Sequence, residues 1–136
     1  MRDLSFQDYE GLTGRGGKIK SRSKALFIAK TAQDKKAQDI VILDIRKASG
    51  ITDFFIICSG TSARQVKAIS DHIIERLKEQ GQRAGHIEGY NHALWVLLDC
   101  GDIVVHVFHA PVRDFYDLER LWGDVPQITL KDHGSK

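Results

Sequence analysis

The chain has 136 residues, of which 42% are hydrophobic and 28% are charged, and its net charge is +2. This length suits one domain with a buried core, and the composition is near that of an average soluble globular protein, which excludes disordered and membrane-embedded classes. The longest apolar runs, 54–58 and 93–98, have the length of strands and are too short to cross a bilayer.

The positive charge is concentrated at the N-terminus. Residues 1–24 carry a net charge of +3, so the rest of the chain carries −1. This remainder lacks the basic excess typical of proteins that bind nucleic acid through their overall field. Residues 1–22, which contain four glycines and no apolar periodicity, are predicted to be a flexible basic tail. The stretch Arg15–Lys18 either contacts RNA or is a solvated terminus.

The sequence also bears on the cellular compartment. The first residues have no apolar stretch of a signal peptide, and Asp3, Asp8 and Glu10 argue against an acid-poor transit sequence. Cys58 and Cys100 lie in or beside apolar runs and are predicted to be buried thiols in a reducing environment. We therefore expect a cytoplasmic protein with no membrane partner.

In chain order, the first predicted element is a helix from Ser23 to near Ala37, because small apolar residues recur there at helical spacing. Two β-branched runs follow, 40–45 and 52–58. The link between them is short, so these two strands are predicted to be antiparallel.

A second helix is predicted from a capping box, in which Ser62 is followed three residues later by Gln65. Its apolar stripe ends before Gly81, a typical C-terminal cap. A weak strand is expected at 84–88.

The clearest hairpin joins strands 94–99 and 102–108 through a predicted two-residue loop, Cys100–Gly101. This register places Trp95 opposite His106 and leaves an all-aliphatic second face, which is predicted to be core. The side of Trp95 and His106 mixes aromatic, polar and acidic groups. It is expected to be covered by a partner or by amphipathic elements of the same chain.

A last helix is predicted to begin near Pro111, with Phe115, Leu118, Leu121 and Trp122 on one face. Pro126 is predicted to end regular structure, and residues 129–136 are expected to be a polar tail. The sequence thus predicts a single α/β domain over 23–128, with a mixed five-stranded sheet and flanking helices.

Catalysis and metal binding find little support. The loop 59–62 lies between a strand and a helix start, where amides can hold phosphate, but it lacks the lysine of a P-loop. Asp99 and Asp102 flank a turn instead of clustering as metal-binding carboxylates. His106 and His109 are three residues apart in a strand and point to opposite sides. We therefore predict no enzyme activity, no metal and no cofactor.

The second half of the chain is rich in residues that often anchor protein interfaces. Trp95 is equally compatible with a binding anchor and with a core side chain, whereas Phe115 and Trp122 are expected to be core. The aromatic, acidic and basic residues concentrated here are Glu88, Tyr90, Trp95, Arg113, Tyr116, Asp117 and Glu119.

Several long motifs, in order, resemble the ribosomal silencing factor or Iojap family over about residues 24–128. They are Asp39-Ile-Val-Ile-Leu-Asp-Ile-Arg46, Thr52-Asp-Phe-Phe-Ile-Ile-Cys-Ser-Gly-Thr-Ser-Ala-Arg-Gln-Val-Lys-Ala68, Glu88-Gly-Tyr90, Trp95-Val-Leu-Leu-Asp-Cys-Gly-Asp-Ile-Val-Val-His-Val-Phe108 and Arg113-Asp-Phe-Tyr-Asp-Leu-Glu-Arg-Leu-Trp122. The resemblance implies a nucleotidyltransferase-like topology without the catalytic acids.

The resemblance further implies a translational repressor that acts under starvation. Such a protein binds the large ribosomal subunit through its fourteenth protein, sterically blocks joining of the small subunit, and is a homodimer when free. Two alternatives stay open: a large-subunit biogenesis factor and a nucleotidyltransferase-like enzyme. The basic tail, for which the family core has no counterpart, is expected to add at most a weak contact with ribosomal RNA. The implied partner-binding residues are Glu88, Tyr90, Trp95, His106, Arg113, Tyr116 and Asp117.

Overall fold

The computed structural model describes residues 20–130. Residues 1–19 of the expected N-terminal tail and most of the expected C-terminal tail lie outside the described residues, whereas Ser21 and Arg22 already belong to the first helix, which begins two residues earlier than predicted. The elements, in chain order, are α1 (Ser21–Asp34), β1 (Gln38–Asp44), β2 (Phe54–Gly60), α2 (Ala63–Glu79), β3 (His86–Glu88), β4 (Trp95–Asp99), β5 (Ile103–His109), α3 (Ala110–Tyr116), α4 (Leu118–Leu121) and β6 (Gln127–Thr129).

Within the described residues these strands form one mixed sheet in the order β3-β4-β5-β2-β1-β6. The β1–β2 pair is antiparallel, as predicted, and so is the β4–β5 hairpin. The central pair, β2 and β5, is parallel, with Phe54 opposite Ile103 and Gly60 opposite His109. The predicted single α/β domain with a mixed sheet is therefore confirmed, with six strands instead of five.

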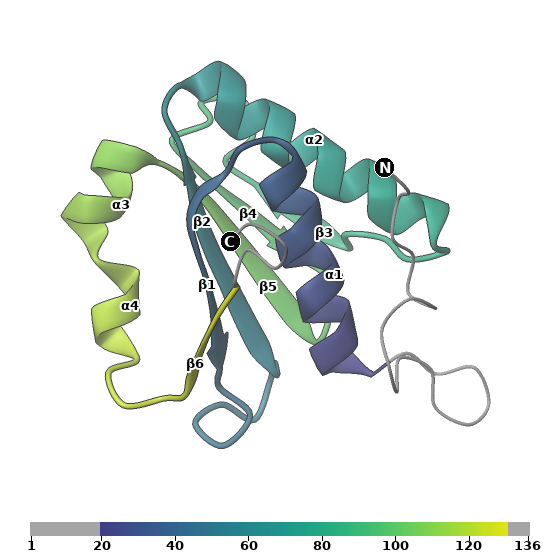
Figure 1. Cartoon of the computed structure of the whole chain (residues 1–136), viewed down its shortest axis with the longest axis vertical. Helices are drawn as coiled ribbons and strands as arrows, with labels where there is room; N and C mark the ends of the chain where they lie inside the picture. The colour runs from purple at the N-terminus through teal and green to yellow at the C-terminus, as the bar shows by residue number, and fades with distance from the viewer. Residues whose placement is uncertain (1–19, 131–136) are drawn as a thin grey trace.

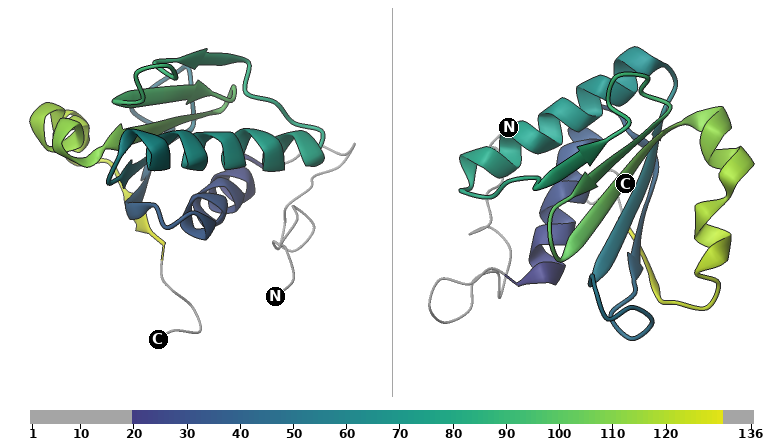
Figure 2. Two further views of the ribbon diagram at one scale, coloured as in Figure 1. Left: turned by 90° about the horizontal axis from the view of Figure 1, so that it is seen from above. Right: turned by 180° about the vertical axis from the view of Figure 1, so that it is seen from behind.

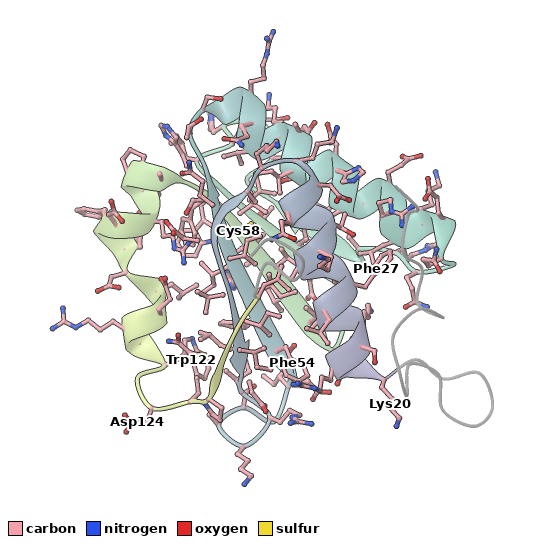
Figure 3. The ribbon with its side chains drawn as sticks, viewed as in Figure 1. Lys20, Phe27, Phe54, Cys58, Trp122 and Asp124 are labelled. Atoms are coloured by element: carbon pink, nitrogen blue, oxygen red, sulfur yellow. The ribbon has the colours of Figure 1, made fainter. Side chains whose placement is uncertain are left out.

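The sheet has a different cover on each face. Helices α1 and α2 lie together on one face, and α3 and α4 stand on the other side (Figures 1 and 2). The face toward α1 and α2 carries the larger core, which includes Phe27 of α1 and Phe54 and Cys58 of β2 (labelled in Figure 3). The opposite face has a small cluster built around Ile57, Phe108 and Leu118. Alternation along β2 divides its side chains between the two.

Local hydrogen bonds cap both ends of α2. Ser62 accepts a hydrogen bond from the Gln65 amide at 3.1 Å, which confirms the predicted cap, whereas the Gln65 side chain reaches back to the Thr61 amide and not to that of Ser62. At the other end the amides of Gly81 and Gln82 donate to the carbonyls of Lys78 and Leu77 in a Schellman arrangement.

The hairpin register differs from the prediction by two residues. Trp95 lies opposite Phe108, and His106 lies opposite Leu97. The amide of Cys100 donates to the carbonyl of Ile103, so the loop is Gly101–Asp102 and not Cys100–Gly101. Gly101 has a φ of +88°, and a tight hairpin turn favours glycine at its first loop position for this reason.

The C-terminal region departs further from the prediction. The expected single helix is split at Asp117, whose φ of +49° interrupts the helical backbone. Because of this break Phe115 and Leu121 face solvent, with exposed fractions of 81% and 77%, and the prediction that Phe115 is core was wrong. Leu118 and Trp122 do pack against the sheet, the latter on the inner side of α4 (Figure 3).

Regular structure does not stop at Pro126. Its carbonyl accepts a hydrogen bond from the Asp44 amide at 2.9 Å, and β6 then pairs antiparallel with β1. A proline lacks an amide hydrogen, but it suits the start of an edge strand because its carbonyl can still pair. This strand is the sixth one that the sequence did not reveal.

Across residues 20–130, no helix is both long enough and apolar enough to span a membrane.

Candidate functional site

The candidate site is the sheet face turned away from α1 and α2, which we call the aromatic face. It is defined by Phe55, Trp95, His106 and Phe108 of the sheet together with Tyr116 of α3. Its centre is Trp95, whose indole Nε1–H donates to Nδ1 of His106 at 3.0 Å. Trp95 is half-buried, so its side chain both packs inside the domain and reaches the surface. The core alternative is therefore partly correct, and the role of Trp95 as a binding anchor stays a prediction.

The bond to Trp95 fixes the state of His106. An indole N–H can only donate, so Nδ1 must be the accepting nitrogen and the ring proton sits on Nε2. This Nε2 is buried and has no hydrogen-bond partner within the described residues. Burial disfavours the charged ring and lowers the pKa of His106 to about 4, so the ring is neutral at physiological pH.

Aromatic rings surround this pair. The Trp95 ring centre lies 4.7 Å from that of Phe108 and 5.0 Å from that of Tyr116. Phe55 packs edge-on against His106 at 4.7 Å. These separations are in the range where aromatic pairs attract each other beyond simple burial. The cluster holds Trp95 in one orientation while leaving part of its ring open.

Beside Trp95 the surface is hollowed. An apolar hollow of about 380 Å³ is lined by Leu94, Trp95, Pro111, Val112, Phe115 and Tyr116. Leu94 and Tyr116 are about half exposed, at 48% and 53%, and Phe115 is almost fully exposed. Large apolar side chains grouped around a hollow are typical of surfaces that bind another molecule.

The loop before β4 is shaped to approach Trp95 closely. Gly89 has a φ of +77°, and a Cβ added there would lie 2.2 Å from the main-chain oxygen of Trp95. Its carbonyl also accepts a hydrogen bond from the amide of Ala93 at 3.0 Å. The glycine of the Glu88-Gly-Tyr90 motif is therefore required by the backbone itself.

Glu88 and Tyr90, which flank this glycine, point to different sides of the domain. Glu88 lies opposite Leu97 in the sheet and so shares the aromatic face with Trp95, at the exposed β3 edge. Tyr90 instead packs toward α2: its hydroxyl donates to Asp71 at 3.0 Å, and Lys67 lies over its ring at 5.4 Å. The structure thus does not bring Tyr90 together with the rest of the predicted set.

Arg113 lies on the aromatic side but is buried, with only 8% of its surface exposed. Its guanidinium donates to Glu119 at 2.8 and 3.1 Å and to the hydroxyl of Ser59 at 2.9 Å. All of these contacts are internal. That Arg113 contacts a partner stays a prediction, and the interactions observed here are structural.

Tyr116 and Asp117 are exposed at the junction of α3 and α4, which we call the elbow. Asp117 lies 3.9 Å from Arg120 in a solvent-exposed ion pair, which contributes little to stability. Asp114, which precedes Phe115 in α3, is also exposed, but neither acid lines the hollow.

The loop that suggested phosphate binding is already internally bonded. Ser59 accepts from Arg113, the Thr61 amide donates to the Gln65 side chain at 2.6 Å, and Ser62 caps α2. Of the two turn acids, Asp99 accepts from the Gly101 amide and Asp102 pairs with the buried Lys24 at 3.3 Å. These groups have structural roles that account for their presence.

The cysteines are buried, as predicted. Desolvation raises the pKa of Cys58 to about 12 and that of Cys100 to about 11, which makes both thiols poor nucleophiles. In the described part of the chain, no three His, Cys, Asp or Glu side chains come together in a way that could hold a metal ion.

Several residues of this site were not expected from the sequence. The sequence predicts Phe115 and Leu94 to be core, but both are exposed: Phe115 lies beside the elbow, and Leu94 lies between Ala93, whose φ is +56°, and the start of β4 at Trp95. Glu119 has no feature in the sequence that distinguishes it from the neighbouring acids. Its spacing of six residues from Arg113 does not match the i, i+3 or i, i+4 pairing of a continuous helix, so no helical signal could have paired them.

Fold and site together describe a mixed α/β domain with an exposed aromatic hollow, a combination typical of protein-binding surfaces. Residues 18–136 match the family described as "Ribosomal silencing factor during starvation". The chain therefore belongs to the ribosomal silencing factor family, which includes proteins named Iojap.

Individual relatives agree with this assignment. The chain is 47% identical over 112 residues to the ribosomal silencing factor RsfS of Bacillus subtilis, covering 82% of this chain and 95% of the relative. It is 31% identical over 93 residues to the mouse protein named mitochondrial assembly of ribosomal large subunit protein 1, covering 66% of this chain and 41% of that relative. A crystal structure of a protein from Bacillus halodurans is similar with a TM-score of 0.71 and 41% identity, covering 82% of this chain and all of that one.

Proposed function

We propose that this protein represses translation by binding the large ribosomal subunit through its fourteenth protein and sterically blocking the small subunit from joining. Membership of the silencing factor family supports a role in regulating translation at the ribosome. The observation that carries the proposal is the hollow beside Trp95, because exposed, grouped aromatic side chains are the residues that most often anchor one protein on another.

Charge supports a basic protein as the partner. The exposed acids Asp114 and Asp117 flank Phe115 and Tyr116 in the chain, and Glu88 lies on the same side of the sheet as Trp95. Acidic groups near an apolar docking surface would steer a basic partner toward it. Binding of this kind needs no reaction, so the protein acts by occupying space.

The test is co-sedimentation of the protein with free large subunits, followed by light scattering of subunit joining. The double variant Phe115→Ala, Tyr116→Ala removes two exposed rings and should weaken subunit binding by roughly 30-fold, as loss of an interface anchor does. Ile51→Ala is the matched control, because Ile51 is also an exposed hydrophobic residue, at 93%, but lies in the β1–β2 turn. Equal binding by the double variant and the control would contradict the proposal.

A role in large-subunit biogenesis is the second candidate, favoured by the likeness to the mouse assembly protein. The same surface would serve both roles, and the timing would differ. A repressor leaves subunit maturation intact when its gene is deleted and changes translation only in starved cells. Accumulation of immature large subunits in growing deletion cells would favour the biogenesis role.

The oligomeric state and the tail complete the proposal. We expect the free protein to be a homodimer, which analytical ultracentrifugation would measure directly. We further expect residues 1–22 to add at most a weak contact with ribosomal RNA, so that deletion of residues 1–19, which leaves α1 intact, reduces the salt dependence of subunit binding without abolishing it.

A further inference from the structure

An ion pair between Arg113 and Glu119 links α3 and α4 across the elbow. Nε and Nη2 of Arg113 donate to one oxygen of Glu119 at 3.1 and 2.8 Å. The two side chains are only 9% and 24% exposed. Because Arg113 precedes Asp117 and Glu119 follows it, this pair spans the point where the helix breaks.

The Arg113 guanidinium is also hydrogen-bonded to the sheet. Its Nη1 donates to the hydroxyl of Ser59, near the end of β2, at 2.9 Å and approaches the carbonyl of Gln38, the first residue of β1, at 3.5 Å. An arginine side chain presents its donors in a rigid planar fork. One side chain therefore sets the position of both short helices relative to the two strands.

The elbow needs the Arg113–Glu119 ion pair to stabilise its backbone conformation. Asp117 adopts a left-handed conformation, which is unfavourable for a residue other than glycine. The Asp117 backbone is held by two local bonds: its amide donates to the carbonyl of Arg113 at 2.8 Å, and its carbonyl accepts from the Arg120 amide at 3.0 Å. Helices as short as α3 and α4 are not stable alone.

We propose that Arg113 and Glu119 are positioning residues of the docking surface, a step that rests on the proposed function. They hold the elbow in the one arrangement that turns Phe115 and Tyr116 outward around the hollow, with the Tyr116 ring 5.0 Å from that of Trp95. Arg113 thus acts on the partner from inside the domain, by organising the side chains that touch it.

The test compares Glu119→Ala with Glu119→Gln in a titration of large subunits. The alanine variant loses the carboxylate that accepts from Arg113, so the elbow can leave the arrangement that turns Phe115 and Tyr116 outward. If the arrangement is then populated about a tenth of the time, apparent affinity falls about tenfold. Glutamine keeps an oxygen that accepts from the guanidinium, so it should bind within about threefold of the wild type. Glu79→Ala is the matched control, because Glu79 also pairs with an arginine, Arg76, at 2.9 Å, but within α2, on the other side of the sheet from the hollow.

A second measurement reports on the elbow without any ribosome. The chain has two tryptophans, so its proton–nitrogen NMR spectrum has two indole signals, which Trp122→Phe assigns. Glu119→Ala should shift the Trp95 signal, because the Tyr116 ring leaves it, and glutamine should restore the signal. If the alanine variant unfolds, Arg113→Lys replaces it. A lysine lacks the planar fork that lets Arg113 bond Glu119 and Ser59 at once, and about tenfold weaker binding is again expected.

Wild-type affinity in the alanine variant, or an unmoved Trp95 signal, would overturn the positioning role. Failure of the wild-type protein itself to bind large subunits would instead remove the proposed function. In that case the shift of the Trp95 indole signal alone shows whether the Arg113–Glu119 ion pair orders the elbow.

Discussion

The buried histidine of the aromatic face makes the stability of this protein depend on pH in a defined direction. In the folded protein desolvation lowers the pKa of His106 from 6.5 to about 4. In the unfolded chain the ring is hydrated and recovers its ordinary pKa. Between these two values the unfolded chain therefore binds one more proton at this site than the folded protein does.

The free energy of unfolding must fall wherever the unfolded state binds more protons. The contribution of His106 is thus fully present above about pH 6.5 and is lost as the pH falls toward 4. The loss reaches about 2 kcal/mol near pH 5 and about 3 kcal/mol once both states are protonated. A loss of this size is a large part of the stability of a small domain.

The assay is urea unfolding followed by circular dichroism near pH 7.5 and near pH 5. His106→Gln serves as the reference, because glutamine does not titrate and its amide oxygen can accept a hydrogen bond as Nδ1 does. Carboxylates that titrate in this range affect both proteins equally, so the difference between them isolates the histidine. If wild type and variant lost the same free energy between the two pH values, the assignment of a buried neutral ring would be refuted.

Five further substitutions test the packing, each measured as the free energy of unfolding in urea. Gly89→Ala should cost at least about 2 kcal/mol, because the new Cβ meets a main-chain oxygen at a left-handed position, whereas Gly50→Ala, in open space, should stay within about 0.5 kcal/mol. Phe108→Ala should cost about 3–5 kcal/mol, since the ring is fully buried, and Phe115→Ala less than about 0.5 kcal/mol. Arg46→Ala removes an ion pair whose arginine is half exposed, so it should cost less than about 1 kcal/mol. A large loss of unfolding free energy in Gly50→Ala, Phe115→Ala or Arg46→Ala would show that the local packing is described incorrectly.

The division of the hairpin into a core side and a surface side could be predicted although its register could not. Strand side chains alternate with a period of two, so an error of exactly two residues leaves every side chain on its correct face. Val96 and Val105 are accordingly buried in the core, and Trp95 and His106 share the other face. The turn itself depends on which residue takes the positive φ, and Cys100–Gly101 and Gly101–Asp102 both contain the required glycine.

The C-terminal third could be predicted less well, for physical reasons that differ between elements. The break at Asp117 uses a left-handed residue that is not glycine, so the sequence carries no clear signal for it. Strand β6 has three residues and owes its existence to a free edge of β1, which is a property of the assembled sheet. How far Trp95 is exposed depends in turn on where Tyr116 lies, and the elbow decides that.

The unequal cover of the two sheet faces has a consequence for motion. Two long helices protect one side, whereas the other side rests on a few residues around Leu118 and one charge pair. Amide hydrogens of α3 and α4 should therefore exchange with solvent through local openings well before those of β2 and β5, which exchange only on global unfolding. A partner that binds to α3 and α4 would stabilise these helices and slow the exchange of their amide hydrogens. Binding at this surface and ordering of the two helices are therefore coupled.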